Sequence, residues 1–336
     1  MKKQVEKEEK KEEVVVHQEE QNDYVPVEEP APEPITYSDK PLEEIENARA
    51  AFYKVFNIQN TIKWIAALLC IGIMIFGCVG IPNIVPGDKP QLQQGLMWGL
   101  IIGAAAIMIV YSVVSKRMIN KKMRKYFTFY YRKVNENAFN QEGFANDVLQ
   151  EPGKIDVDLF RDNNLYKDVI DVGSRGLTEF EYNGIPMRIV DCAGNIRDEK
   201  RIRPVFVGKM LHCATKYLGE NTIVIYFKGN EKALPPTNVT ELKVIEDNPK
   251  YYIRSNSADV KKVITPAIKK MLDGIEMNKY LVDLAISMHD GKIYVCFGYD
   301  DPLMILPLQK QFNPKPNEQF KKDLGQVIKV VEALNK

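Results

Sequence analysis

Two long stretches without a charged side chain constrain this chain more than any other feature. Residues 64–81 and 96–114 are apolar apart from Tyr111 and Ser112, and the polar connector Pro82–Gly95 separates them. At about 1.5 Å per residue, a helix of about 18 apolar residues covers most of the roughly 30 Å hydrocarbon core of a bilayer. The sequence therefore predicts a helical hairpin that crosses a membrane twice.

The charge of the chain is balanced overall but unevenly distributed. The 336 residues, which leave room for about two domains, carry a net charge of +1. The first 46 residues hold 15 Asp and Glu against six Lys and Arg, whereas the segment after the second apolar stretch is strongly basic. A net charge this close to zero gives no reason to expect nucleic acid as a partner.

The composition divides the chain into five segments. An acidic, Pro-rich tail cannot bury enough apolar surface to fold, so it is expected to be disordered. A pre-membrane helix, the transmembrane hairpin and a basic aromatic juxtamembrane helix follow, and a cytoplasmic domain completes the chain. The predicted bounds of these segments are 1–41, 42–61, 62–115, 116–145 and 146–336.

Positive charge predicts the orientation of the hairpin. Lys and Arg remain on the cytoplasmic side of short flanks, and twelve of them lie just outside the apolar stretches, against Lys89 in the connector. Both termini are therefore expected in the cytoplasm. Neither apolar stretch contains Asp, Glu, Lys, Arg or His, which argues against an ion path or a proton relay.

Small residues recur along the second apolar stretch. Gly95, Gly99 and Gly103 follow one another at intervals of four, which places them on one face of a helix. Such a face lets another backbone approach closely, so we predict a packing seam against the first span or against a second copy of the chain. The alternative is that glycine is simply common in membrane helices.

A basic run follows the second apolar stretch. Apolar residues from Ile119 to Val134 fall on one helical face, and cations surround that face. We predict that these cations contact anionic lipid headgroups at the membrane surface, although the orientation of the hairpin would require a similar cluster without any lipid-specific role. The predicted membrane-surface residues are Lys116, Arg117, Lys121, Lys122, Arg124 and Lys125.

Beyond residue 146 the pattern changes to short β-branched and aromatic runs. Asn183-Gly184 and Asp290-Gly291 each separate two such runs, and both dipeptides favour two-residue hairpin turns. Strand pairs interleaved with a few helices predict a membrane-anchored α+β fold with antiparallel sheet. Further expected elements are a strand pair of Thr222–Phe227 with Glu241–Ile245, a strand at Tyr251–Arg254, a helix from Ser257 to about Leu272 and a helix at Phe320–Leu334.

Several segments resemble a known family. The sequences TIVIYFKG, YYIRSNSADVKKVITPAIKKML and AISMHDGKIYVCF follow the hairpin and the basic aromatic helix in this order. In this arrangement the chain resembles a bacterial family of two-span membrane proteins known as domain of unknown function three-one-three-seven. The resemblance covers residues 116–308 and implies a two-span protein of the bacterial plasma membrane. It brings no activity, and the acidic tail and residues 198–219 depart from it.

Three short motifs suggest chemistry that their surroundings do not support. Asp191–Gly194 (DCAG) is not accompanied by the phosphate-binding GxxxxGK[ST] of a GTPase, so it is expected at the end of a β-hairpin. Gly173–Gly176 (GSRG) has acidic flanks and is expected in a turn, not on an RNA backbone. His212-Cys213 suggests a catalytic base beside a nucleophile, but adjacent residues point in different directions, so the two side chains are not expected to reach each other.

No metal or cofactor is expected, since the chain has three His and no CxxC pair.

Without a catalytic motif, the sequence favours a non-enzymatic membrane protein whose cytoplasmic domain binds a protein partner or scaffolds an assembly. Membrane lipids and either a protein partner or a second copy of the chain are the expected partners. One alternative is an enzyme whose polar groups converge only in the fold, and its candidate residues are Asp191, Arg188, His289 and Asp290. Another is an oligomeric membrane pore built from the hairpin on the glycine seam.

Overall fold

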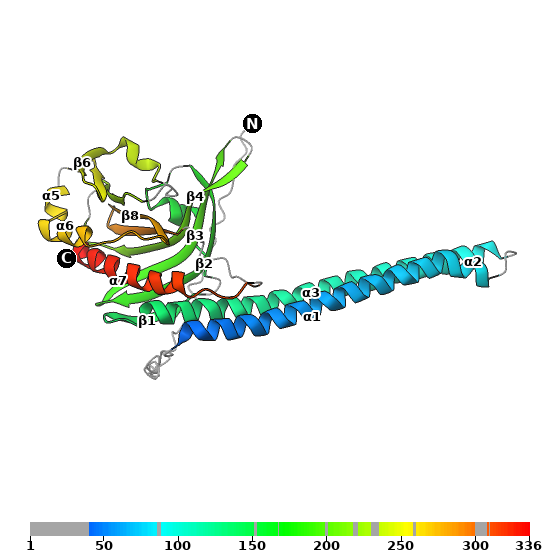
Figure 1. Ribbon diagram of the computed structural model, residues 1–336. Helices are drawn as coiled ribbons and strands as arrows, with labels where there is room; N and C mark the ends of the chain where they lie inside the picture. The colour runs from blue at the N-terminus through cyan, green and yellow to red at the C-terminus, as the bar shows by residue number, and fades with distance from the viewer. Residues whose placement is uncertain are drawn as a thin grey trace, which may run out of the picture. The chain divides into compact units, whose positions relative to one another are not determined.

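The fold combines two long helices with a nine-stranded antiparallel sheet and a few shorter helices (Figure 1). The structure is a computed structural model. It describes residues 40–85, 89–150, 153–166, 168–198, 201–217, 221–229, 235–257, 260–299, 308 and 310–336. The predicted membrane-anchored α+β fold is confirmed. The predicted disordered tail lies outside the described residues except for its last two positions.

Two helices, each longer than one membrane span, contain the apolar stretches. α1 (Pro41–Ile75) continues through the π-helical turn η1 (Phe76–Gly80) into the short α2 (Ile81–Ile84). α3 (Pro90–Phe139) returns beside α1 (Figure 1). Both helical segments are long and apolar enough to cross a membrane. The predicted boundaries after residues 61 and 115 therefore fall inside continuous helices, with no break in the chain of backbone hydrogen bonds.

The apolar parts of α1 and α3 pack along a narrow line. Cys70 Sγ donates a hydrogen bond of 3.7 Å to the Ala104 carbonyl, and both residues are buried. In η1, a Cβ at Gly77 would lie 3.9 Å from the Leu100 side chain, which is ordinary van der Waals contact, so the two helices lie side by side here without requiring glycine. Large apolar side chains such as Leu68 point outward and are exposed, as expected of surfaces that a bilayer would cover.

A single antiparallel sheet makes up most of the folded domain. Its spatial order is β1-β2-β3-β4-β9-β8-β5-β7-β6. The 3₁₀ turn η2 (Asn238–Glu241) leads into β6. The strands are β1 (Phe144–Leu149), β2 (Val169–Tyr182), β3 (Ile185–Asp198), β4 (Arg201–Ala214), β5 (Ile223–Phe227), β6 (Lys243–Asp247), β7 (Tyr251–Ser255), β8 (Leu281–His289) and β9 (Lys292–Tyr299).

The two predicted hairpin turns are confirmed. β2 and β3 are joined at Asn183-Gly184, and β8 and β9 are joined at Asp290-Gly291. All four residues have positive φ angles, between 45° and 77°, as a type I′ turn requires. Asn, Asp and Gly tolerate this left-handed region better than other residues, so these dipeptides set the register of both strand pairs.

The expected pairing of Thr222–Phe227 with Glu241–Ile245 is wrong. β5 pairs with β7 on one side and with β8 on the other, and β6 pairs with β7. The short strand expected at Tyr251–Arg254, now β7, thus lies between the two. A local pattern of apolar residues identifies a strand but does not say which strand becomes its neighbour.

The helix expected over residues 257–272 is two helices, α5 (Val260–Val263) and α6 (Pro266–Asp273). Proline at the first position of α6 cannot donate a backbone hydrogen bond to the preceding turn, so the helix is interrupted there. The Thr265 side chain caps α6 instead, because its hydroxyl oxygen accepts a hydrogen bond from the Ile268 amide. The closing helix is confirmed as α7 (Lys315–Asn335).

Helices and loops cover both faces of the sheet. On one face, α6, α7 and the last turns of α3 bury the larger core together with the strands. Figure 1 shows α7 lying across this face. On the opposite face, α4 (Val157–Arg161) and its flanking segments bury a smaller core that includes Phe160 and Phe206.

The ends of α1 and α3 belong to the folded domain. Phe139, in the last turn of α3, stacks on Phe180 of β2 and Phe144 of β1, with ring centroids 4.6 and 5.5 Å apart. Glu46 of α1 accepts a hydrogen bond of 2.8 Å from the Phe312 amide, in the segment before α7. The predicted domain boundary at residue 146 therefore falls inside β1, and both helices enter the domain without a linker.

Gly176 makes room for α3 against β2. The register between β2 and β3 shifts between Arg175 and Thr178, and Gly176 inside this bulge has a φ of 67°. A Cβ at Gly176 would lie 2.5 Å from the ring of Tyr131, which is buried on α3. Both the backbone conformation and the approach of α3 therefore require glycine.

Replacing Gly176 by Ala should lower the free energy of unfolding by about 1–3 kcal/mol, since Ala is strained at positive φ and would displace Tyr131. Thermal unfolding of the detergent-solubilised full chain, followed by circular dichroism, measures this loss. The matched control is Gly173→Ala in the same strand, where a Cβ would meet no atom within 4 Å. Equal unfolding midpoints for the two variants would contradict this account of the packing.

Candidate functional site

A groove lies between α3, beyond its apolar stretch, and the first strands of the sheet. It has a volume of about 320 Å³ and is named here the α3–β2 groove. Its lining comes from α3, β1, β2 and the segment between β1 and α4. The lining residues are Asn120, Met123, Arg124, Phe127, Thr128, Tyr131, Leu149, Gln150, Lys154, Arg175 and Gly176.

The periodicity of α3 provides the apolar floor of the groove. Met123, Phe127 and Tyr131 follow one another at intervals of four, so they share one face of the helix. Met123 and Phe127 are half-buried, whereas Tyr131 is buried against Gly176. The floor is thus more buried at Tyr131, where it meets β2, than at Met123 and Phe127.

Three cationic side chains from different elements surround this floor. Arg124 belongs to α3, Lys154 to the segment before α4 and Arg175 to β2, and all three are exposed. The Arg175 guanidinium lies 4.7 Å from the centroid of the Phe127 ring, in a cation–π contact that positions it over the groove. None of the described lining residues is acidic. The groove therefore presents positive charge around an apolar floor.

A buried ion pair lies beside Tyr131. Asp191 of β3 and Lys209 of β4 face each other across the strand pair and are 2% and 5% exposed. Lys209 Nζ donates a hydrogen bond to Asp191 Oδ1 and lies 4.9 Å from the centroid of the Phe320 ring on α7. Burial raises the pKa of Asp191, and the charge of Lys209 opposes this rise. The pair is buried between β3, β4 and α7, so we interpret it as a structural contact among these elements and not as part of a ligand site.

A second polar cluster lies on the opposite face of the sheet. The Tyr294 ring stacks with the rings of His212 and His289, at centroid distances of 5.8 and 5.6 Å. A ring nitrogen of His289 contacts the Asp162 carbonyl, and Lys292 forms an ion pair of 3.3 Å with the Asp162 carboxylate. Burial, assisted by nearby cations, lowers the pKa of His212 to about 4, so this side chain is neutral at pH 7. The cluster ties the segment after α4 to the β8–β9 hairpin.

The four residues of the enzyme hypothesis are not brought together. Asp191 is buried on the α7 face of the sheet, whereas Arg188 pairs with Glu179 at 2.8 Å beside the second polar cluster. His289 belongs to that cluster, and Asp290 is exposed in its hairpin turn. Within the described ranges, no group of three or more His, Cys, Asp or Glu side chains is placed to hold a metal ion.

The structure turns the predicted glycine face away from α1. A Cβ at Gly95, Gly99 or Gly103 would meet no atom within 4 Å. The seam is therefore not formed between the two helices of one chain, and contact with a second copy stays a prediction. The six predicted membrane-surface cations are all exposed on α3, and Arg124 among them also lines the α3–β2 groove.

The three short motifs have mixed outcomes. Gly173–Gly176 is not the expected turn, because it lies inside β2 at the bulge. Asp191–Gly194 likewise lies inside β3 and not at a hairpin end. The prediction for His212 and Cys213 is confirmed, since His212 stacks on one face of the sheet and Cys213 belongs to the core on the other.

Sequence reasoning missed Lys154 and Arg175 as groove residues. Lys154 lies 38 positions after Lys116, the first of the predicted membrane-surface cations, and Arg175 lies farther still. Both approach α3 only because β2 packs along that helix. The one local signal was a glycine next to Arg175 in a β-rich region, which is typical of a bulge or of a close backbone approach.

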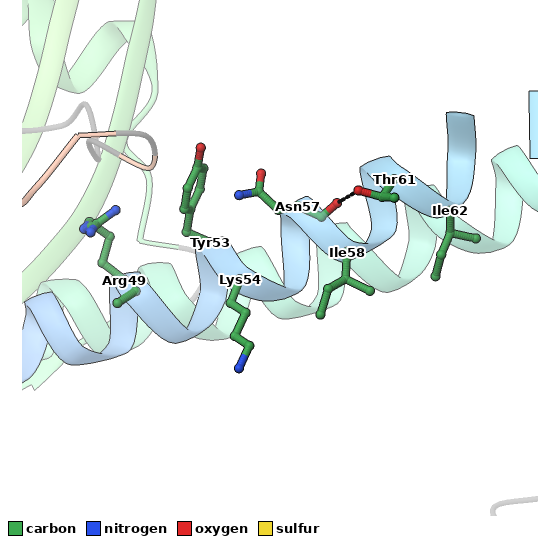
Figure 2. A pocket seen from close by; sticks show the side chains of 8 residues that line it. Arg49, Tyr53, Lys54, Asn57, Ile58, Thr61 and Ile62 are labelled. Atoms are coloured by element: carbon green, nitrogen blue, oxygen red, sulfur yellow. Dashed lines mark hydrogen bonds between the residues drawn. The ribbon is translucent and has the colours of Figure 1, made fainter. Parts of the chain in front are cut away.

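Another hollow, of about 510 Å³, lies along α1. Figure 2 shows that its side chains follow one another along a single helix. Thr61 Oγ1 donates a hydrogen bond of 3.0 Å to the Asn57 carbonyl, and Arg49 is held by the Glu46 carboxylate and the Leu308 carbonyl. Its described lining residues all belong to α1, so their polar groups do not converge from different elements as in most ligand sites. The α3–β2 groove is therefore the candidate site.

Comparisons with known proteins give a distant structural likeness. No family model matches the chain, and no curated protein matches it. Among solved structures, the chain is similar to the crystal structure of the mycobacterial trehalose monomycolate transport factor A, with 13% sequence identity and a TM-score of 0.31. The likeness covers 58% of this chain and 94% of that one. At this level it carries no argument about function.

A buried carboxyl group makes the stability of the domain depend on pH. Asp283 of β8 is 3% exposed. Burial raises its pKa to about 7, and hydrogen bonds from Tyr226 and from the Leu284 backbone only partly oppose this. In the unfolded chain the pKa is about 3.9. The folded chain therefore binds the extra proton between about pH 4 and pH 7, and stability should fall as the pH rises through this range.

The variant Asp283→Asn should flatten this pH dependence, because the amide does not titrate. Some slope should remain, since burial also raises the pKa of Asp323 to about 6. Urea unfolding midpoints of the full chain in detergent, measured between about pH 5 and pH 8, check this. The control Asp290→Asn, at an exposed turn, should keep the wild-type slope. A wild-type midpoint that increases with pH would contradict the raised pKa.

Proposed function

We propose that this protein is a membrane-anchored, non-enzymatic binding module whose folded domain faces the cytoplasm and binds a protein partner or scaffolds an assembly. The observation that carries the proposal is the unbroken passage of α3 from its apolar stretch into the domain core, where Phe139 is 2% exposed. α1 accompanies it, and hydrogen bonds from Arg49 and to Glu46 join α1 to the segment before α7.

Two continuous helices make a rigid anchor. A domain on a flexible linker explores a volume that grows with linker length. A domain whose core contains its own anchor helices keeps a fixed distance and orientation relative to the bilayer. This placement supports a role in presenting a binding surface to other proteins at the same membrane, because both partners then meet in a defined geometry.

The edge strand β6 offers a surface for such a partner. Within the described part of the chain, β6 pairs with β7 and has no second neighbour. Val244 and Ile245 of β6 are 46% and 37% exposed, whereas Val224 and Ile225 of β5 are fully buried. Unpaired backbone groups next to exposed apolar side chains are the features by which an edge strand accepts a strand from another protein.

The proposed orientation predicts the behaviour of reporter fusions. A reporter that is active only outside the cytoplasm should be active when inserted in the connector at Gly87 and inactive when fused after Lys336, because the flanking cations hold both termini inside. A reporter that is active only in the cytoplasm should give the reverse pattern. Activity of the external reporter at Lys336 would contradict the proposed orientation.

The edge-strand surface predicts a selective loss of partners. Crosslinking in intact cells, followed by purification of the full chain, should recover a reproducible set of proteins. Val244→Lys combined with Ile245→Lys should lower their yield roughly tenfold, since two charges on the edge oppose strand addition. The control is Ile202→Lys, at another exposed apolar position, and it should leave the yield unchanged. A yield no higher than that of an unrelated two-span protein would contradict the binding role.

A further inference from the structure

A third hollow lies at the C-terminal end of α3. It has a volume of about 490 Å³ and is named here the α7 pocket. Its lining comes from three separate segments, which are residues 141–144 after α3, residues 182–183 where β2 ends, and one face of α7 between residues 322 and 329. This volume suits a small molecule, and side chains converge on it from different elements, as in most ligand sites.

Hydrogen bonds join the walls of the α7 pocket to one another. Gln141 Nε2 donates a hydrogen bond of 3.0 Å to the Lys321 carbonyl of α7. Gly325 makes room for this contact, because a Cβ there would lie 2.5 Å from Gln141 Oε1. On the other side, the Asn183 backbone amide donates a hydrogen bond of 2.9 Å to the Gly143 carbonyl. The pocket is therefore part of the fold, as pre-formed ligand sites are.

The α7 pocket combines an apolar floor with a polar rim. The rings of Phe144 and Tyr182 meet edge to face with their centroids 5.0 Å apart, and Tyr182 is buried. Ile328 of α7 also lines the pocket and is buried. The exposed side chains of the lining are Glu142, Asn183, Lys322, Gln326 and Lys329. A ligand therefore meets apolar groups on one side and charges and amides around it.

The charges of the rim have opposite signs but do not pair. Lys322 and Lys329 are seven positions apart and share one face of α7, whereas Glu142 comes from the turn after α3. Within the described part of the chain, none of these three side chains makes a hydrogen bond or an ion pair. Lys336, just beyond α7, instead pairs with Glu332 at 3.0 Å. Opposite charges that line one hollow without contacting each other leave space for a ligand between them.

The α7 pocket is far from the membrane. α3 ends at Phe139, which is 25 residues beyond the end of the apolar stretch at Val114 and thus about 38 Å further along the helix. Headgroups extend only roughly 5–8 Å beyond the hydrocarbon. The ligand therefore comes from the aqueous phase, which is the cytoplasm in the orientation proposed above.

We propose that the α7 pocket binds an acidic amino acid. Two ammonium groups and one carboxylate line the pocket, and an acidic amino acid carries the reverse set, two carboxylates and one ammonium group. Lys322 and Lys329 would donate hydrogen bonds to the ligand carboxylates, and Glu142 would accept one from its ammonium group. A dicarboxylate without the ammonium group would bring like charge toward Glu142, so the rim also selects against simple organic acids. This ligand site adds to the proposed function and does not depend on its protein partner.

Calorimetric titration of the full chain in neutral detergent, with L-glutamate as the probe, tests the proposal. L-Glutamate should bind about tenfold or more tightly than L-glutamine, which lacks the second carboxylate. Lys322→Gln combined with Lys329→Gln should weaken L-glutamate binding by about tenfold or more. The matched control, Lys315→Gln with Lys336→Gln, removes the same charge at exposed positions at the two ends of α7 and should change binding by less than about threefold.

The variant Glu142→Gln tests recognition of the ammonium group. The wild type should prefer L-glutamate to glutarate, which has both carboxylates but no ammonium group, by about tenfold. In Glu142→Gln this preference should disappear, because the charge that attracts the ammonium group and repels glutarate is gone.

Several results would overturn the assignment. One is the absence of binding of both L-glutamate and L-aspartate at about 10 mM. Equal affinity of the wild type for L-glutamate and glutarate, or equal weakening by the two double variants, would show a general attraction of anions. If circular dichroism shows that the pocket variant does not fold, the exposed Lys322→Gln substitution is measured by itself, and unchanged binding then overturns the proposal. None of these results alters the reporter or crosslinking outcomes, so this inference and the proposed function fail separately.

Discussion

The packing of the aromatic face of α3 against β2 is the contact on which the other features of the molecule depend. Phe139 stacks on Phe180 at the end of the helix, and Tyr131 rests on Gly176 two turns earlier. Removing one such ring from a core typically costs about 3–5 kcal/mol. Because α3 also carries an apolar stretch, this contact turns a helix that could cross a membrane into a rigid part of the sheet domain. As a result, α1 and α3 are both joined to the sheet domain without a flexible linker.

The same contact separates a structural charge cluster from a candidate binding surface. Arg175, Asp191 and Lys209 lie opposite one another on three successive strands. Tyr131 lies beside Asp191 and the Phe320 ring lies beside Lys209, so these two residues are buried as an ion pair, whereas Arg175 stays exposed at the groove. Burying an ion pair adds little net stability, but removing one partner would leave an unpaired charge in the core. The pair therefore makes one alignment of β3, β4 and α7 strongly preferred, and this alignment sets where Arg175 is held.

The elements that sequence predicts well are those encoded in a few consecutive residues. The apolar stretches and the turns at Asn183-Gly184 and Asp290-Gly291 need no information from distant residues. β4 was not expected, because residues 201–214 mix Arg, Pro, Lys and His with apolar residues and its buried side chains belong to two different cores. The order β8-β5-β7-β6 and the bulge at Gly176 were missed for a related reason. A glycine in a turn and a glycine in a bulge have the same local signal, and only the approach of α3 distinguishes them.

The candidate groove shows why function was harder to predict than fold. A cation that membrane orientation requires and a cation that a binding site requires look the same in a sequence. They differ in whether distant segments place like charges at one point, where the charges repel each other. Lys154 and Arg175 join Arg124 in this way, and none of the described groove residues is acidic. Such a convergence exists only in the fold, so no local pattern in the sequence could have indicated it.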